Sequence, residues 1–122
     1  MPDLPSEDES VRKLRDRGVP DHVIQGGSKA LTERWRNFVR QVENGYPLGL
    51  DDYRNDLDIR ELIAFLGLDS EVAEEDERLR ATLTGGDRAI WESELADAFW
   101  VRGFPRNARG ELLADLHAEG FI

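Results

Sequence analysis

The amino-acid sequence predicts an all-α protein, a compact single-domain bundle of five to seven short helices with a mobile acidic N-terminal tail. Apolar residues recur at the three- and four-residue intervals that place them on one face of a helix. Glycines separate these stretches at short intervals, as helix stops do. No stretch alternates between apolar and polar residues over the length of a strand. The 122 residues suffice for one domain.

The first nine residues include two prolines and four acids, with almost no apolar surface to bury. We therefore expect residues 1–9 to form a flexible tail and residues 10–122 to form a single helical domain. A short helix is predicted up to Gly18, which acts as its stop. Pro20 suits the first turn of a second short helix, which ends before Gly26.

The clearest predicted helix spans residues 29–44. Ser28 precedes it as a good N-cap, and Gly45 follows it as a stop. Its apolar residues lie on one helical face, and they are Leu31, Trp35, Phe38, Val39 and Val42. We expect this face to form a large part of the core.

Two separate helical segments are predicted between residues 51 and 66. Asp51 or Asp52 is expected to cap a single helical turn, because an aspartate oxygen accepts the free N–H groups at a helix start. Asp56 or Asp58 is expected to cap a longer helix that ends before Gly67. The apolar stripe of this second helix consists of Ile59, Leu62, Ile63 and Leu66.

Three further helices complete the prediction. A polar helix is expected over residues 70–83, before a pair of glycines. Asp87 is expected to cap the next helix, whose apolar side consists of Ile90, Trp91, Leu95, Ala98 and Phe99. The last helix is predicted over residues 107–118, and Phe121 is expected to fold back onto the core.

The composition excludes several classes of function. The chain has no cysteine, so a disulfide scaffold, a thiolate nucleophile and a cysteine-ligated zinc site are impossible. Two histidines without a partner motif favour a non-enzymatic protein over an enzyme, without excluding one, and no cofactor is expected. Short apolar runs and an acidic N-terminus predict a cytoplasmic protein without a membrane partner. The preference for arginine over lysine is typical of a GC-rich bacterial genome.

The net charge of −10 is unevenly distributed. Residues 10–40 carry eight basic and three acidic side chains, whereas residues 41–99 carry five basic and sixteen acidic ones. The leading hypothesis is a non-enzymatic protein whose acidic middle region binds another, basic protein, as an adaptor, an inhibitor or an immunity-type protein. Its oligomeric state stays open. The candidate partner-binding residues are Tyr46, Asp51, Asp52, Tyr53, Asp56, Asp58 and Trp100, and Glu74–Glu77 add charge.

Two alternatives come from other classes of function. The basic segment 10–40 could belong to a nucleic-acid-linked regulator with Arg34 and Arg36 exposed, although the net charge opposes an approach to phosphates. The aspartates between Asp51 and Asp58 could be the centre of a metal-dependent enzyme or of a ligand-binding protein. No register of these residues fits the calcium-loop template, however.

Overall fold

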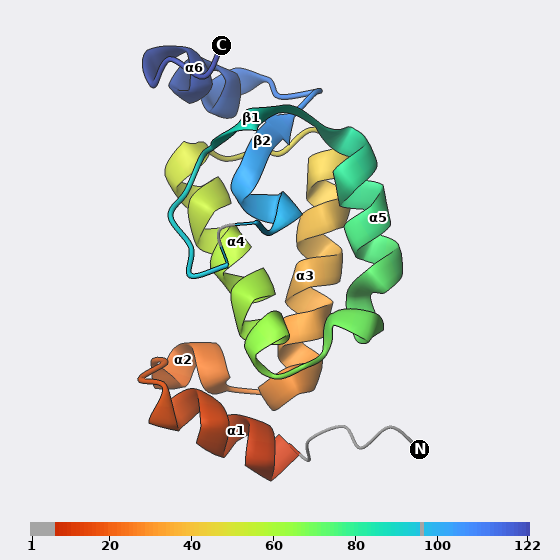
Figure 1. Cartoon of the computed structure of the whole chain (residues 1–122), viewed down its shortest axis with the longest axis vertical. Coiled ribbons are helices and arrows are strands. Elements are labelled where there is room, and N and C mark those ends of the chain that lie inside the picture. Colours follow the sequence, from red (N-terminus) through yellow and green to blue (C-terminus); the bar gives the residue numbers. More distant parts are fainter. Residues whose placement is uncertain (1–6, 96) are drawn as a thin grey trace.

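The computed structural model describes residues 7–95 and 97–122. This part of the chain contains six α-helices, two 3-10 turns and a two-stranded hairpin, with α1 and α2 at the opposite end of the domain from the hairpin (Figure 1). The elements are α1 (Glu7–Asp16), α2 (Asp21–Ile24), α3 (Gly27–Glu43), α4 (Leu50–Phe65), η1 (Asp69–Val72), α5 (Ala73–Thr82), β1 (Leu83–Ala89), η2 (Phe99–Val101), β2 (Arg102–Pro105) and α6 (Gly110–Ala118). The predicted helical class is confirmed, with the hairpin as an addition. Most of the predicted tail over residues 1–9 lies outside the described residues, and α1 begins at Glu7.

Helix α3 lies at the centre of the domain because its apolar residues follow one helical face. The predicted face is confirmed, since all its members are buried, namely Leu31, Trp35, Phe38, Val39 and Val42. Helices α4 and α5 pack on two sides of α3, and α1 lies against it near one end (Figure 1). The helix begins at Gly27, two residues earlier than predicted, directly after Gly26 in the left-handed conformation. This position of α3 decides which faces of α4 and α5 remain exposed.

The two segments predicted between residues 51 and 66 are in fact one continuous helix, α4. No glycine or proline interrupts residues 50–65, so nothing in the sequence forces the backbone out of the helical conformation. The aspartates do not cap this helix. Instead, the backbone N–H of Leu50 donates to Oδ2 of Asp115 in α6 at 3.0 Å. Asp51 and Asp52 occupy the first turn, where the helix dipole favours negative charge.

The helix predicted from Asp87 is wrong, and a β-hairpin takes its place. Helix α5 ends at Thr82, and β1 then runs antiparallel to β2 in a register that pairs Leu83 with Pro105. The two glycines within β1 disfavour a helix. The described residues between β1 and η2 are irregular. The hairpin joins segments that are distant in sequence, so no local pattern could predict it.

The C-terminal segment packs against the core as expected, but its helix starts later. Helix α6 begins at Gly110, and the side chain of Asn107 caps the C-terminal end of α3. Its Nδ2 donates to the carbonyls of Val42 and Glu43 at 3.0 and 3.1 Å. Phe121 is half-buried against the core, as predicted. No helix of the described residues combines the length and the apolar composition that crossing a bilayer requires.

A buried ionic cluster joins α3, α4 and α5. Arg60 of α4 is 2% exposed and donates to both carboxylate oxygens of Asp76, from Nε at 3.0 Å and from Nη2 at 2.8 Å. Nε1 of Trp35 donates to the same carboxylate at 3.0 Å. Arg60 also pairs with Asp69 at 2.7 Å and lies 4.3 Å from the centroid of the Trp100 ring. Three helices therefore meet at one charged group in the interior.

Candidate protein-binding site

The three aromatic residues that were predicted as partner anchors lie in the core. Tyr46 and Tyr53 are 1% and 0% exposed, and their rings pack edge to face. The Tyr46 hydroxyl donates to Asp56 at 2.5 Å; burial and then this hydrogen bond raise the pKa of Tyr46 above its usual value. Trp100 is 6% exposed beneath Arg60. A binding surface must therefore consist of other residues.

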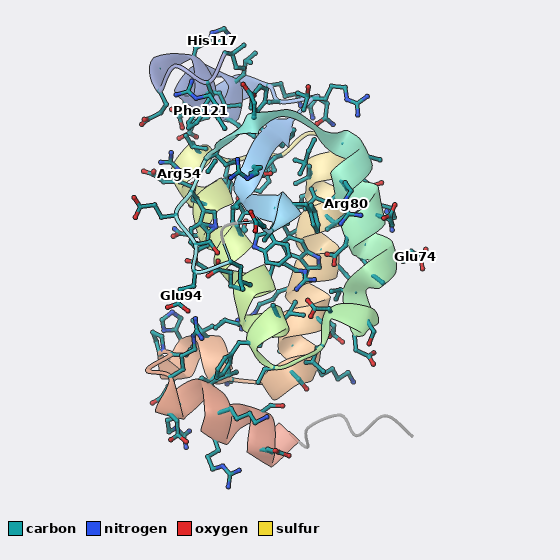
Figure 2. All side chains as sticks on the ribbon, in the orientation of Figure 1. Arg54, Glu74, Arg80, Glu94, His117 and Phe121 are labelled. Carbon is teal, nitrogen blue, oxygen red and sulfur yellow. The ribbon has the colours of Figure 1, made fainter. Side chains whose placement is uncertain are left out.

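The predicted acidic residues do not form a single surface. At about 100° per residue, Asp51 and Asp58 share one stripe of α4, while Asp52 and Asp56 share another stripe roughly 130° away. Asp56 lines a shallow hollow beside α3, whereas Asp58 lines hollows on the other side of α4. The acids Glu74–Glu77 begin α5, and Glu74 projects from the side of the molecule opposite to α4 (Figure 2).

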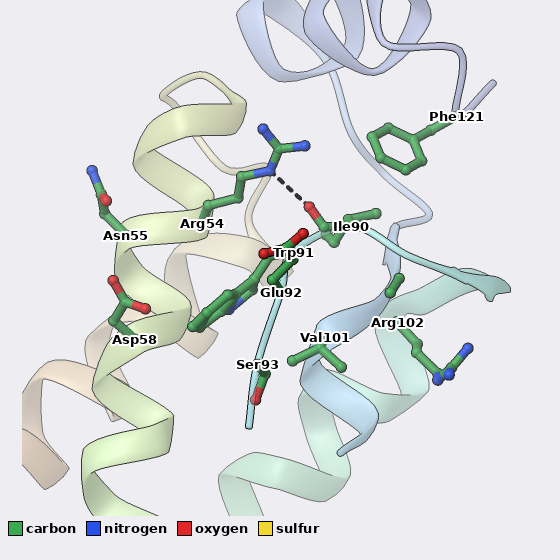
Figure 3. Close-up of a pocket in the computed structure, with 11 residues that line it drawn as sticks. Arg54, Asn55, Asp58, Ile90, Trp91, Glu92, Ser93, Val101, Arg102 and Phe121 are labelled. Atoms are coloured by element: carbon green, nitrogen blue, oxygen red, sulfur yellow. Dashed lines mark hydrogen bonds between the residues drawn. The ribbon is translucent and has the colours of Figure 1, made fainter. Parts of the chain in front are cut away.

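Two hollows that share Asn55 and Asp58, named here together the α4 cleft, lie along the exposed side of α4. The first wall of the cleft is the turn between α1 and α2; its second wall is the irregular segment after β1, where Trp91 lies beside α4 (Figure 3). Asn55 and Asp58 line the hollows on both sides, so α4 forms the floor. The hollow along the first wall measures about 600 Å³, enough for several side chains of a partner. Its apolar lining consists of Val19, Pro20, Val23, Ile59 and Leu62.

Large apolar side chains are exposed where the cleft reaches the C-terminal end of α4. Phe65 and Leu95 are 41% and 43% exposed, and both line one small hollow. Glu61 and Glu94 line this hollow as well, and Arg17 enters it from the first wall. Neighbouring apolar side chains that remain exposed are typical of interaction surfaces. This end of the cleft therefore combines apolar contact area with negative charge.

Two carboxylates in the cleft form no direct ion pair with the described residues. Asp58 and Glu61 line the same hollow, and neither forms an ion pair with any residue that the structure describes. Partial burial raises the pKa of Asp58. Burial, and then the charge of Asp58, raise the pKa of Glu61, whose carboxylate accepts a hydrogen bond from Oγ of Ser93. Negative charge that has lost part of its water and forms no direct ion pair favours a bound cation.

Glu61→Gln should stabilise the protein at neutral pH by about 0.2–0.5 kcal/mol, because the change removes a partly buried charge and its repulsion by Asp58. Since the pKa of Glu61 is raised, the folded state binds the proton more tightly than the unfolded state does. The free energy of unfolding therefore falls as the pH rises through that pKa, and it stays lower above it.

Urea unfolding of both proteins at about pH 3.5 and about pH 7 measures the effect. The gain should appear at the higher pH alone. Glu33→Gln, on the exposed side of α3, is the matched control. An equal gain from Glu61→Gln at both pH values would contradict the charge explanation.

The basic segment 10–40 is partly neutralised within the fold. Nε of Arg36 pairs with Glu75 at 3.0 Å, and its Nη2 donates to the carbonyl of Glu71. Nη1 of Arg34 donates to the carbonyl of Val23 at 3.2 Å. The described residues also contain no group of three or more histidine, aspartate or glutamate side chains arranged to hold a metal ion. Neither alternative site is as well formed as the α4 cleft.

The α4 cleft retains Asp58 from the predicted site and adds residues that sequence reasoning missed. Phe65 could have been found by treating residues 50–65 as one helix, because inward positions at Tyr53 and Leu57 turn Phe65 outward. No sequence pattern could indicate that Leu95 lies beside Phe65, since the position of Leu95 depends on an irregular segment. No protein family, curated protein or solved structure matches this chain, so its function has to be inferred from the geometry and charge of the α4 cleft.

Proposed function

We propose that the protein acts by binding another protein, a basic segment of which lies in the α4 cleft. The observation that carries this proposal is the pair Asp58 and Glu61, two partly shielded carboxylates that form no direct ion pair with any described residue and lie in a cleft with an apolar lining. A cation of the partner would supply the favourable electrostatic interaction that these two carboxylates lack in the free protein. The apolar lining would supply contact area.

The net charge of −10 supports the same proposal at longer range. A protein with this charge attracts a basic partner before contact, which raises the association rate and makes it sensitive to salt. An adaptor, an inhibitor and an immunity-type protein would all use the cleft in this way. Nucleic-acid binding through residues 10–40 has less support, because Arg36 already pairs with Glu75. Metal binding has less support because the aspartates of α4 are divided between two stripes.

The double variant Asp58→Lys/Glu61→Lys should slow association with the partner by roughly tenfold and flatten its salt dependence. The partner is first captured from a lysate of the source cells and purified. Association rates are then measured at about 50 mM and about 300 mM NaCl. Glu74→Lys/Glu77→Lys on α5 is the matched control, because it changes the net charge equally on another surface. If both variants slow association equally, net charge explains the effect and the α4 cleft is not the binding face.

A further inference from the structure

Arg17 already places a guanidinium group at the end of the α4 cleft. This group lies 4.6 Å from the centroid of the Phe65 ring, and its Nη2 lies 3.3 Å from Oε2 of Glu94. Figure 2 shows Glu94 next to α2, on the side of the domain that faces this helix. Burial raises the pKa of Glu61, and the positive charge of Arg17 counteracts part of this rise. One arginine is thus bound by an aromatic face and by the field of two carboxylates.

These contacts are the ones by which proteins recognise arginine. A planar guanidinium stacks on an aromatic ring and donates hydrogen bonds in its plane to carboxylates, whereas the compact ammonium of lysine does not stack in this manner. We propose that Phe65, Glu61 and Glu94 form an arginine-binding subsite of the α4 cleft. Arg17 occupies this subsite in the free protein, and an arginine of the partner displaces it. This inference rests on the proposed function, because it takes the partner to be a basic protein.

Arg17 is held loosely enough to be displaced. Its ion pair with Glu94 is exposed to solvent, with 34% and 82% of the two side chains accessible, and such pairs contribute little to stability. The residue follows the last turn of α1 and precedes Gly18, whose φ of 89° begins the turn toward α2. Rotation of the Arg17 side chain therefore leaves the helices in place. Phe65 remains 41% exposed, so its ring can receive a second ligand.

The subsite can be tested without knowing the partner. The probe is N-acetyl-arginine amide, added to the full-length chain and followed by the amide NMR shifts of Phe65 and Leu95. Arg17→Ala should bind the probe with a dissociation constant about threefold to tenfold lower than that of the wild type. Arg12→Ala, which removes an exposed arginine of α1, should leave the constant unchanged. Adding Phe65→Ala to Arg17→Ala should abolish the gain.

Three results would overturn the inference. The first is an Arg17→Ala variant that binds the probe no better than the wild type does, and the second is an equal gain in Arg12→Ala. The third is an equal response to N-acetyl-lysine amide, because simple attraction between charges would then explain the binding. Far-UV circular dichroism and urea unfolding confirm that each variant is folded. The proposed function fails separately, if the double variant Asp58→Lys/Glu61→Lys associates with the purified partner at the same rate as the wild type.

Discussion

Asp76→Ala should lower the free energy of unfolding by about 3–5 kcal/mol, a large share of the roughly 5–15 kcal/mol that stabilises a domain of this kind. The carboxylate of Asp76 is the acceptor for both Arg60 and Trp35. Without it, the guanidinium of Arg60 stays buried with only Asp69 as a partner, and Nε1 of Trp35 loses its acceptor. An uncompensated charge in the interior is among the most destabilising single changes.

Urea unfolding at neutral pH measures this effect, and Asp69→Ala is its control. Asp69 pairs with the same guanidinium, but its side chain is 59% exposed, so water replaces it and the loss should stay below about 1 kcal/mol. The double variant Arg60→Met/Asp76→Leu should be more stable than Asp76→Ala, because it removes the unpaired charge. Equal losses for Asp76→Ala and Asp69→Ala would show that the cluster does not hold the three helices together.

Gly103→Ala should destabilise the protein by about 2–4 kcal/mol. Gly103 has a φ of 77°, a conformation that residues with a side chain adopt at a cost. A Cβ atom at this position would also lie 2.5 Å from the carbonyl oxygen of Thr84 in β1. Because that atom belongs to the backbone of the paired strand, the hairpin itself would have to shift.

Gly86→Ala is the matched control in the same hairpin. A Cβ atom at Gly86 meets nothing within 4 Å. The substitution should therefore leave stability unchanged or raise it by about 0.4–1 kcal/mol, through the lower entropy of the unfolded chain. Thermal and urea unfolding of both variants give the comparison. If the two alanines lower stability equally, loss of glycine within the strands is responsible and the close approach at Gly103 is not.

Local sequence patterns predict the helical part of this fold well. The apolar face of α3 has five members at helical spacing, and its burial needs no knowledge of the other elements. The hairpin could not be predicted in this way. It pairs segments that are distant in sequence, such as Leu83 with Pro105, and neither strand alternates in polarity over a recognisable length.

The site was harder to predict than the fold. If residues 51–66 are divided into two short helices, their aspartates look like exposed caps, and Tyr46 and Tyr53 look like exposed residues beside them. Once α4 begins at Leu50, Tyr53 and Arg60 fall on its inward side. Arg60 in the core is unpredictable from periodicity, because a charged residue enters the interior only with partners supplied by distant segments, here Asp76. Arg17 and Glu94 likewise meet only through tertiary structure.

The hydrogen bond from the Leu50 N–H to Asp115 ties the start of α4 to the last helix of the chain. The two residues are 65 positions apart, so a chain that is still being synthesised has only water to accept this N–H until Asp115 has been added. A protein truncated before α6 would lack this acceptor, and we expect its α4 to fray first at Leu50.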